Sequence, residues 1–407
     1  MTLQKPFHFA PRVVGGLAAA FIVLVSTAVF AARKKTAPGN PDVHVAQGNA
    51  LASQNNWDGA IAEYRKAIQA APGNAAAHYN LGNALAAKQD LDGAIAEYHE
   101  ALRLAPASPD AHNNLGLALQ QKGDLPGAIV EYREALRLRP DDARTHYNLA
   151  NALAAQHGTL SPHGGTNATD AVDEYREALR LDPKDPDTHN NLGLALQSLG
   201  DVSGAIAAYR QALALKQDDF EAHYNLAGAL SGKQDWDGAI TEYRLALVLK
   251  PGDASAHDNL GFVYAAKGDL SHAIAEYRQA LRWSPQDADA HLNLASALAR
   301  QQDWAGSMAE CRLALVEQPN NARAHVRLGQ ALAGEGDLPR AIAEYQRAAQ
   351  IDPNDAGAPY ALGAALEKQG DLKGALEAYR TAVRLDPQNP QPRRDFQRLA
   401  KQIELGK

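Results

Sequence analysis

Cysteine is nearly absent from this sequence, since Cys311 is the only one among 407 residues. A single thiol excludes an intramolecular disulfide framework and any metal site built from several cysteines. The chain also has no basic excess, because its formal charge at pH 7 is −7. That balance argues against nucleic-acid binding, which needs a basic stripe. The motifs of phosphate-binding loops, hydrolase nucleophile elbows and zinc-protease helices do not occur. These absences favour a non-catalytic protein without a cofactor or a bound metal.

Long apolar runs are missing too, with one exception. Residues 13–32 carry no charge and are long enough to cross the hydrocarbon core of a bilayer. We predict a transmembrane signal anchor here, preceded by an N-terminal tail (residues 1–12) and followed by a basic flank and linker (residues 33–40). A cleaved signal peptide is the alternative, with the tripeptides 26–28 and 29–31 as cleavage sites.

Basic residues flank this run on both sides. Lys5 and Arg12 precede it, and Arg33, Lys34 and Lys35 follow it, so the positive-inside count is nearly balanced. We favour a single-pass membrane protein with the rest of the chain outside the cytoplasm, and export after cleavage is the alternative.

A period of 34 residues fills most of the chain. Ten units follow one another, and the fourth is nine residues longer than the others. A unit this short cannot bury its own apolar face, so it must stack on its neighbours. We number these units repeats 1 to 10, and they span residues 41–74, 75–108, 109–142, 143–185, 186–219, 220–253, 254–287, 288–321, 322–355 and 356–389.

Each repeat has the pattern of two amphipathic helices. In repeat 2, Leu81, Leu85, Ile95 and Tyr98 belong to apolar sets spaced three and four residues apart. A Gly-Asp pair stands between the two helices in several repeats, as at 123–124, and indicates a turn. Proline near the end of the unit stops the second helix.

Three positions recur with the period. Position 20 is alanine in nine repeats, position 24 is tyrosine in nine and position 32 is proline in nine. With Leu-Gly at positions 7 and 8, this pattern resembles the tetratricopeptide repeat (TPR) family. The resemblance implies an all-α fold, a right-handed α-solenoid superhelix of helix-turn-helix units. First helices would line its concave face and second helices its convex face.

The end of the chain and repeat 4 depart from the period. Residues 390–407 place Phe396, Leu399 and Ile403 on one helical face, which predicts a C-terminal capping helix. The extra length of repeat 4 falls at residues 157–169, whose proline and glycines predict a loop.

Histidine and cysteine offer little chemistry here. Nine histidines stand at position 4 of successive repeats, one per repeat, and so they do not converge on a metal ion. We interpret them as a packing position. Cys311 replaces the tyrosine of position 24 in repeat 8, and we expect a buried, inert thiol.

Asparagine is more informative. Position 6 is asparagine in seven consecutive repeats, namely Asn80, Asn114, Asn148, Asn191, Asn225, Asn259 and Asn293. In the TPR family this position faces the groove, and in some glycosyltransferases of the family such a ladder holds extended peptide backbone. An amide both donates and accepts, so it pairs with any peptide group. Each rung would match about three residues of polyproline-type chain. The alternative is that asparagine simply belongs to the repeat consensus.

Basic residues in the groove suggest a second contact. Some family members clamp a C-terminal carboxylate, and Arg144, Arg323 and Arg327 are the possible carboxylate contacts here. The resemblance to that clamp is partial, because its first lysine is replaced by Tyr79 at one end of the array and by Asp258 at the other.

These features predict a non-catalytic, membrane-tethered scaffold. Its partners would be proteins or extended peptides bound in the concave groove, with the membrane contacted through residues 13–32. Two alternatives stay open. The chain could be a stably bound subunit or assembly factor of an envelope complex, or an adaptor that recruits an enzyme such as a glycosyltransferase.

Overall fold

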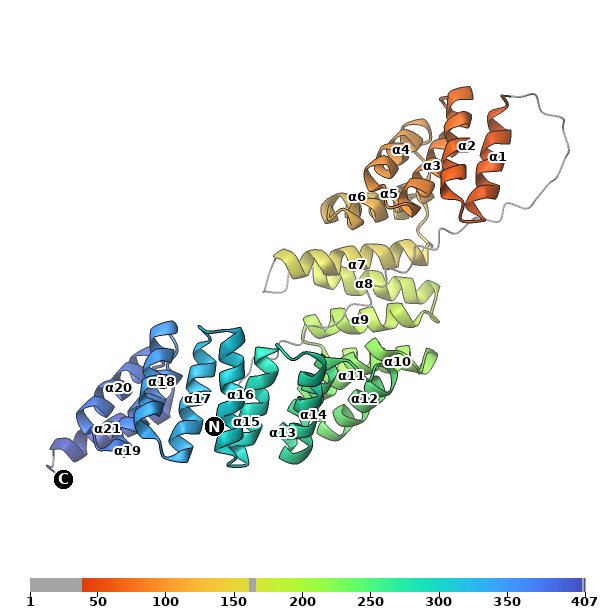
Figure 1. The fold of residues 1–407 in the computed structure, drawn as a ribbon. Coiled ribbons are helices and arrows are strands. Elements are labelled where there is room, and N and C mark those ends of the chain that lie inside the picture. Colours follow the sequence, from red (N-terminus) through yellow and green to blue (C-terminus); the bar gives the residue numbers. More distant parts are fainter. Residues whose placement is uncertain (1–38, 161–165, 405, 407) are drawn as a thin grey trace. The chain divides into compact units, whose positions relative to one another are not determined.

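The computed structural model describes residues 39–160, 166–404 and 406 (Figure 1). It contains 21 α-helices, and the described residues contain no strand. The predicted all-α fold of stacked helical hairpins is therefore confirmed. The predicted membrane segment at residues 13–32 lies outside the described residues. Within the described part, no helix is both long and apolar enough to cross a membrane.

The chain divides into two compact units, residues 1–229 and 230–407, and we describe each by itself. Within each unit consecutive helices pair into hairpins, from α1–α2 to α9–α10 in the first unit and from α13–α14 to α19–α20 in the second, and α21 follows alone. The helices are α1 (Pro41–Ala52), α2 (Trp57–Ala70), α3 (Ala75–Ala87), α4 (Leu91–Leu104), α5 (Pro109–Gln121), α6 (Leu125–Leu138), α7 (Ala143–Leu160), α8 (Thr166–Leu181), α9 (Pro186–Ser198), α10 (Val202–Leu215), α11 (Phe220–Gly232), α12 (Trp236–Leu249), α13 (Ala254–Lys267), α14 (Leu270–Trp283), α15 (Ala288–Arg300), α16 (Trp304–Glu317), α17 (Ala322–Glu335), α18 (Leu338–Ile351), α19 (Gly357–Gln369), α20 (Leu372–Leu385) and α21 (Pro390–Glu404).

Every second helix except α8, whose preceding residue lies outside the described part of the chain, begins at a capping aspartate or asparagine side chain. The Asp90 carboxylate accepts a hydrogen bond from the Gly93 backbone N–H at 3.0 Å, and Asp124 caps α6 through Gly127 in the same way. Such a cap satisfies a backbone donor that the first turn of a helix leaves unpaired. The residue before the cap has a positive φ. It is glycine in five repeats, as at Gly123 (φ 87°), but Gln89, Gln234 and Gln302 adopt φ values of 63–64°.

Tyrosine at position 24 explains the glycine at position 8 of the first helix. A Cβ added at Gly82 would lie 2.7 Å from the Tyr98 ring, and one added at Gly193 would lie 2.5 Å from Tyr209. These contacts are closer than real Cβ atoms make, so the two helices of a hairpin approach most closely where glycine faces the ring.

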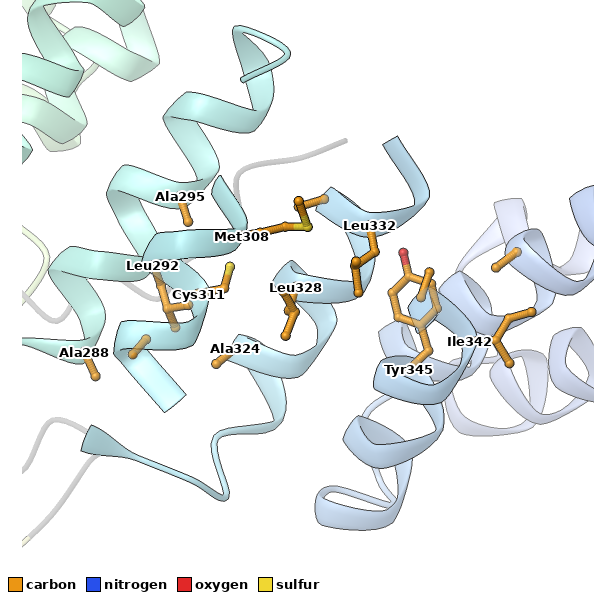
Figure 2. Close-up of a cluster of buried hydrophobic side chains, with 14 residues drawn as sticks. Ala288, Leu292, Ala295, Met308, Cys311, Ala324, Leu328, Leu332, Ile342 and Tyr345 are labelled. Atoms are coloured by element: carbon orange, nitrogen blue, oxygen red, sulfur yellow. The ribbon is translucent and has the colours of Figure 1, made fainter. Parts of the chain in front are cut away.

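Repeat 8 packs differently, as its sequence predicts. Cys311 is fully buried where other repeats place tyrosine, and it lies among Leu292, Ala295 and Leu328 (Figure 2). Burial raises the pKa of the Cys311 thiol to about 12. Reactivity requires the thiolate, so this cysteine is a small apolar core residue.

The loop predicted for the insertion in repeat 4 is wrong in its bounds. Residues 157–160 and 166–169 are helical and not part of a loop, because α7 continues to Leu160 and α8 already begins at Thr166. Only residues 161–165 lie outside the described helices. Extending an existing helix needs no new nucleus, which offsets the low helix propensity of glycine and threonine.

The last helix closes the second unit. Leu399 of α21 is fully buried against Ala375 and Tyr379 of α20, with Phe396 and Ile403 beside it. The predicted capping face of α21 is thus the face that packs on the last hairpin.

Candidate functional site

First helices of successive repeats contact one another in both units, from α1 to α9 and from α13 to α19. The position-6 asparagines lie on this face, and we call them the asparagine row. In the first unit each of them donates its side-chain N–H to the preceding repeat. The donor–acceptor distances are 3.2 Å for Asn80 to Asn49, 2.9 Å for Asn114 to Asn83, 3.0 Å for Asn148 to Asn113, 3.1 Å for Asn191 to Asn151 and 3.1 Å for Asn225 to Asn190. The row therefore holds neighbouring repeats together.

The second unit contains the remaining two members of the row. The Asn293 amide donates to both carboxylate oxygens of Asp258, at 2.9 and 3.0 Å. Asn259 is half-buried. The repeat-to-repeat bond thus persists where a carboxylate replaces the amide acceptor.

The acceptors in the first unit alternate between two arrangements. In repeats 2 and 4, position 5 is tyrosine and position 9 is asparagine, and the next repeat's asparagine bonds to both. Asn114 donates to the Tyr79 hydroxyl at 3.0 Å, and Asn191 donates to the Tyr147 hydroxyl at 3.2 Å. In repeats 3 and 5, position 5 is Asn113 or Asn190 instead, and position 9 is leucine. Across repeats 2 to 5, the polar groups at positions 5 and 9 therefore recur in every second repeat.

We call the two matching arrangements the tyrosine–asparagine triads. One consists of Tyr79, Asn83 and Asn114, and the other of Tyr147, Asn151 and Asn191. The buried tyrosine of position 24 joins each triad, because its hydroxyl donates to Asn83 (2.8 Å, from Tyr98) or Asn151 (2.6 Å, from Tyr175). Burial raises the pKa of both of these tyrosines, so they remain donors.

Exposure varies along the row. Asn191 and Asn225 are almost fully buried, with 2% and 1% of their surface exposed. Tyr79, Asn80 and Asn114 are half-buried and remain accessible on the face. A small hollow beside Asn80 is lined by Asn49, Ala52, Trp57, Tyr64, Asn80, Asn83 and Ala84. The groups with remaining capacity for a ligand thus lie on the repeat 1–3 part of the face.

The position-4 histidines are polar contacts as well as packing residues. His78 places Nδ1 2.6 Å from a Glu97 carboxylate oxygen and Nε2 3.1 Å from the Pro72 carbonyl. The same pair of contacts occurs at His112, His146, His257, His291 and His325. The sequence contained a signal for the histidine–glutamate contact, since glutamate stands at position 23 of each of those repeats.

The pKa values of two of these histidines are shifted. Burial lowers the pKa of His146, but its hydrogen bonds to Glu174 and to the Pro140 carbonyl outweigh burial and raise the pKa above its ordinary value. His257 behaves in the same way with Glu276 and Pro251. Both ring nitrogens face acceptors, which suits the doubly protonated ring. Within the described residues, no group of three or more His, Cys, Asp or Glu side chains is placed to hold a metal ion.

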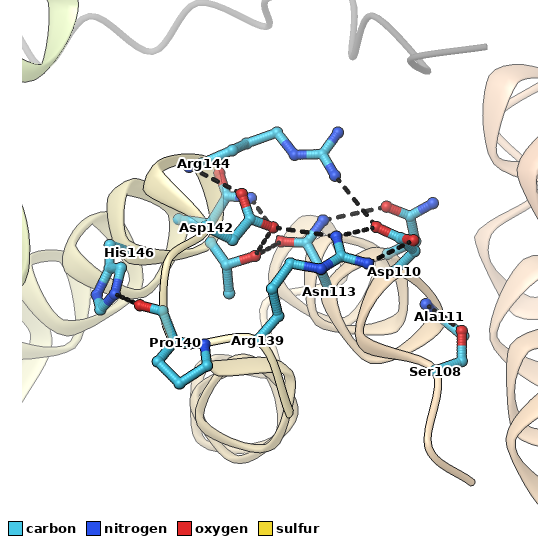
Figure 3. Close-up of polar contacts among 12 residues, drawn as sticks. Ser108, Asp110, Ala111, Asn113, Arg139, Pro140, Asp142, Arg144 and His146 are labelled. Atoms are coloured by element: carbon cyan, nitrogen blue, oxygen red, sulfur yellow. Dashed lines mark hydrogen bonds and ion pairs between the residues drawn. The ribbon is translucent and has the colours of Figure 1, made fainter. Parts of the chain in front are cut away.

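The three predicted arginines differ in what they contact. Asp110 accepts two hydrogen bonds from Arg139, and the Arg144 guanidinium lies 4.0 Å from the same carboxylate (Figure 3). Arg323 pairs with Asp289. Two of the three are thus already matched with an acid.

Arg327 is the exception. It occupies position 6 of repeat 9, in line with the asparagine row, and it is half-buried. Among the described residues it forms no ion pair. Burial, together with the nearby charge of Arg323, lowers the pKa of Arg327. A half-buried cation without an acid is an unbalanced charge on this face.

The family assignment comes from sequence models. A family described as TPR repeat matches residues 48–89, 82–123, 119–156, 167–200, 263–302 and 334–370. Two further models described as tetratricopeptide repeat match residues 190–254 and 360–389. A comparison with curated proteins found no match.

Several solved structures resemble parts of the chain. The MamA protein is 24% identical, covers 44% of this chain and 94% of its own, and gives a TM-score of 0.40. YrrB, described as a TPR protein with an unusual peptide-binding site, is 23% identical, covers 47% and 95%, and gives a TM-score of 0.41. Yeast Tom70 is 15% identical, covers 89% and 96%, and gives a TM-score of 0.41. The family models match more than half of the residues, and the chain belongs to the tetratricopeptide repeat family.

Proposed function

We propose that this protein is a non-catalytic scaffold that binds extended segments of partner proteins along its first helices. Proteins of this family mediate protein–protein interactions. The observation that carries the proposal is the pair of matching tyrosine–asparagine triads, which present the same polar groups two repeats apart. A repeated face suits a ligand that is itself repetitive, such as peptide backbone.

The spacing sets the ligand register. Two repeats advance by roughly 16–20 Å if neighbouring helices are ~8–10 Å apart. About six residues of polyproline-type chain, at ~3.1 Å each, cover that distance. The ligand would therefore bring a backbone carbonyl to Tyr79 and another to Tyr147 about six residues later. In the second unit, Arg327 would receive a carboxylate of a partner segment.

Tethering to a membrane completes the proposal. Residues 13–32 support it by their length and lack of charge. The repeats would then act outside the cytoplasm, although export after cleavage would leave the binding face the same. Extraction of native membranes with alkaline carbonate tests the tether, because an anchored chain stays in the pellet and a peripheral one is released.

A photo-crosslinking scan of the full chain in its native membranes tests the binding face. A photoreactive amino acid at position 79 or 147 should capture one defined partner, whereas the same group at Arg133, an exposed residue of α6, should not. The substitutions Tyr79→Phe and Tyr147→Phe remove the hydroxyls but keep the rings. In this double variant, a photoreactive amino acid placed at position 80 in place of Asn80 should capture the partner at least tenfold less. Equal capture from α6, or unchanged capture in the double variant, would contradict the proposal.

The same experiment separates the alternatives. A stable subunit of an envelope complex should be captured stoichiometrically and survive detergent purification. A recruited enzyme, such as a glycosyltransferase, should be captured substoichiometrically and be recovered through its activity.

A further inference from the structure

Apolar side chains gather on the second helices of repeats 6 to 8. Nine large apolar residues are exposed among the described residues, and six of them lie in this stretch: Leu245, Val248 and Leu249 on α12, Trp283 on α14, and Leu313 and Val316 on α16. We call these six the outer strip. The whole strip lies within the second compact unit. Clustering of this kind marks a contact surface, whereas single exposed apolar residues need no explanation.

The fold does not require apolar residues at these positions. Positions 26 and 29 hold an exposed glutamate–arginine pair in repeats 2 to 4, as in Glu100–Arg103, Glu134–Arg137 and Glu177–Arg180, with N–O distances of 2.6–2.7 Å. In repeats 6 and 8 the same positions hold Leu245 with Val248 and Leu313 with Val316. Because the same backbone accepts the ion pair, the apolar residues serve something outside the hairpin.

The outer strip is also basic. Exposed cations accompany it on the same three helices and at their ends: Arg244, Lys250, Arg278, Arg282 and Arg312. Among the described residues, Arg278, Arg282 and Arg312 form no ion pair. The carboxylates of Glu276 and Glu310 point to His257 and His291 instead, which leaves Glu317 as the exposed acid beside Val316. In the helix ends that carry the strip, residues 244–250, 278–283 and 312–317, five cations thus stand against one acid, in a chain whose formal charge is −7.

The apolar side chains fall at one end of these helices. Each lies in the last five residues of its helix, and Trp283 is the last residue of α14. Trp283 also lies beside the end of α12, since a Cβ added at Gly252 would be 3.3 Å from its ring. The strip therefore continues from α12 to α14. Val248 and Val316 are 75% and 72% exposed, so their side chains project outward.

We propose that the outer strip docks on a bilayer surface rich in anionic lipid. Projecting leucine, valine and tryptophan side chains insert at the boundary between headgroups and acyl chains, where tryptophan is favoured. The guanidinium groups around them bind lipid phosphates and the negative surface potential. This contact does not depend on residues 13–32, and it would lay repeats 6 to 8 against the membrane while the first helices stay available to partners.

Site-specific fluorescence tests the contact in the full chain. Cys311 is fully buried, so a cysteine introduced at Val248 or Val316 is the reactive one and takes an environment-sensitive dye. The control is Val130→Cys on α6, because Val130 is 63% exposed in a repeat that keeps its Glu134–Arg137 pair. The probes are vesicles of phosphatidylcholine alone and vesicles that also contain phosphatidylglycerol.

We expect the dyes at 248 and 316 to shift to the blue only with phosphatidylglycerol, and the shift to reverse at high salt. The dye at 130 should not respond, even if residues 13–32 insert into both kinds of vesicle. A shift of equal size at 130, or an equal shift in neutral vesicles, would overturn the proposal. So would a shift that grows with protein concentration without lipid, which indicates a second copy as the occupant.

Two variants separate the apolar and the charged contributions. Leu313→Glu with Val316→Arg rebuilds the ion pair of repeats 2 to 4 at unchanged net charge, so folding is expected to be retained and circular dichroism checks it. The affinity for anionic vesicles, read from a dye at 248, should fall at least tenfold. Replacing Arg278, Arg282 and Arg312 with glutamine should abolish the preference for phosphatidylglycerol. An unchanged response in both variants would refute lipid docking by the outer strip.

Discussion

Single residues decide where the repeat tolerates strain. Asn55, Gln89, Gln234 and Gln302 occupy the left-handed region at the turn between the two helices, with φ between 58° and 64°, where five other repeats have glycine. Glutamine disfavours this conformation, and asparagine tolerates it better. The Gly-Asp pairs of the sequence predicted a turn at this place. They did not predict that asparagine or glutamine would adopt the left-handed conformation in the other repeats.

This strain gives a stability prediction. Gln302→Gly should raise the free energy of unfolding of its repeat by about 0.5–1 kcal/mol, because the relief of left-handed strain exceeds the extra flexibility of glycine in the unfolded chain. Urea unfolding followed by circular dichroism measures the change. Asn55→Gly is the matched control and should have a smaller effect. A loss of stability in Gln302→Gly would show that the turn is not strained.

The asparagine row shows what sequence could not supply at the residue scale. Its members were identified from the sequence, but their partners were not, because the acceptors at positions 5 and 9 differ from one repeat to the next. The alternation of Tyr79, Asn113, Tyr147 and Asn190 at position 5 was present in the sequence. It acquires meaning only once Asn114 and Asn191 are seen to bond backward to the tyrosines. Whether the row also holds a peptide stays a prediction.

At the scale of the helix pair, histidine–glutamate contacts join the first helix to the second. His146 on α7 meets Glu174 on α8, and His257 on α13 meets Glu276 on α14. The sequence alone indicated a packing position for these histidines, but it did not show that the glutamates are their partners. The helix pattern itself was predictable, since apolar spacing and the proline stops depend on local chemistry. The extended α7 and α8 were not, because proline and glycine in the insertion suggested a loop.

These contacts predict a pH dependence. The folded pKa of His146 and His257 lies above the ordinary value, so the stabilisation is fully present below the unfolded pKa, near 6.5, and is lost as pH rises through the higher folded pKa. A double-mutant cycle of His257→Gln and Glu276→Gln should give a favourable coupling energy in urea unfolding below that range and a smaller one above it. Coupling that grows with pH would contradict the protonated pair.

At the scale of the whole molecule, the fold is an array of stacked helix pairs. Within each unit, each helix pair contacts the next pair, and the first helices of successive repeats also touch. Stability in such an array is a sum of repeat and interface contributions, so a local change stays local. The period of the sequence predicted this organisation. It could not predict the division into two compact units, because the repeats on either side of residue 229 have the same pattern.

The central claim is that each repeat is stabilised only by its neighbours in the array. Its most direct test is hydrogen exchange of the full chain carrying Asn148→Ala. Asn148 is 8% exposed and bonds to Asn113 of the preceding repeat at 3.0 Å, so its loss should weaken one interface. We predict faster amide exchange in α5 to α8 and unchanged exchange in α17 to α20. Faster exchange throughout the chain would contradict the account, because it would mean that the repeats unfold as one cooperative body.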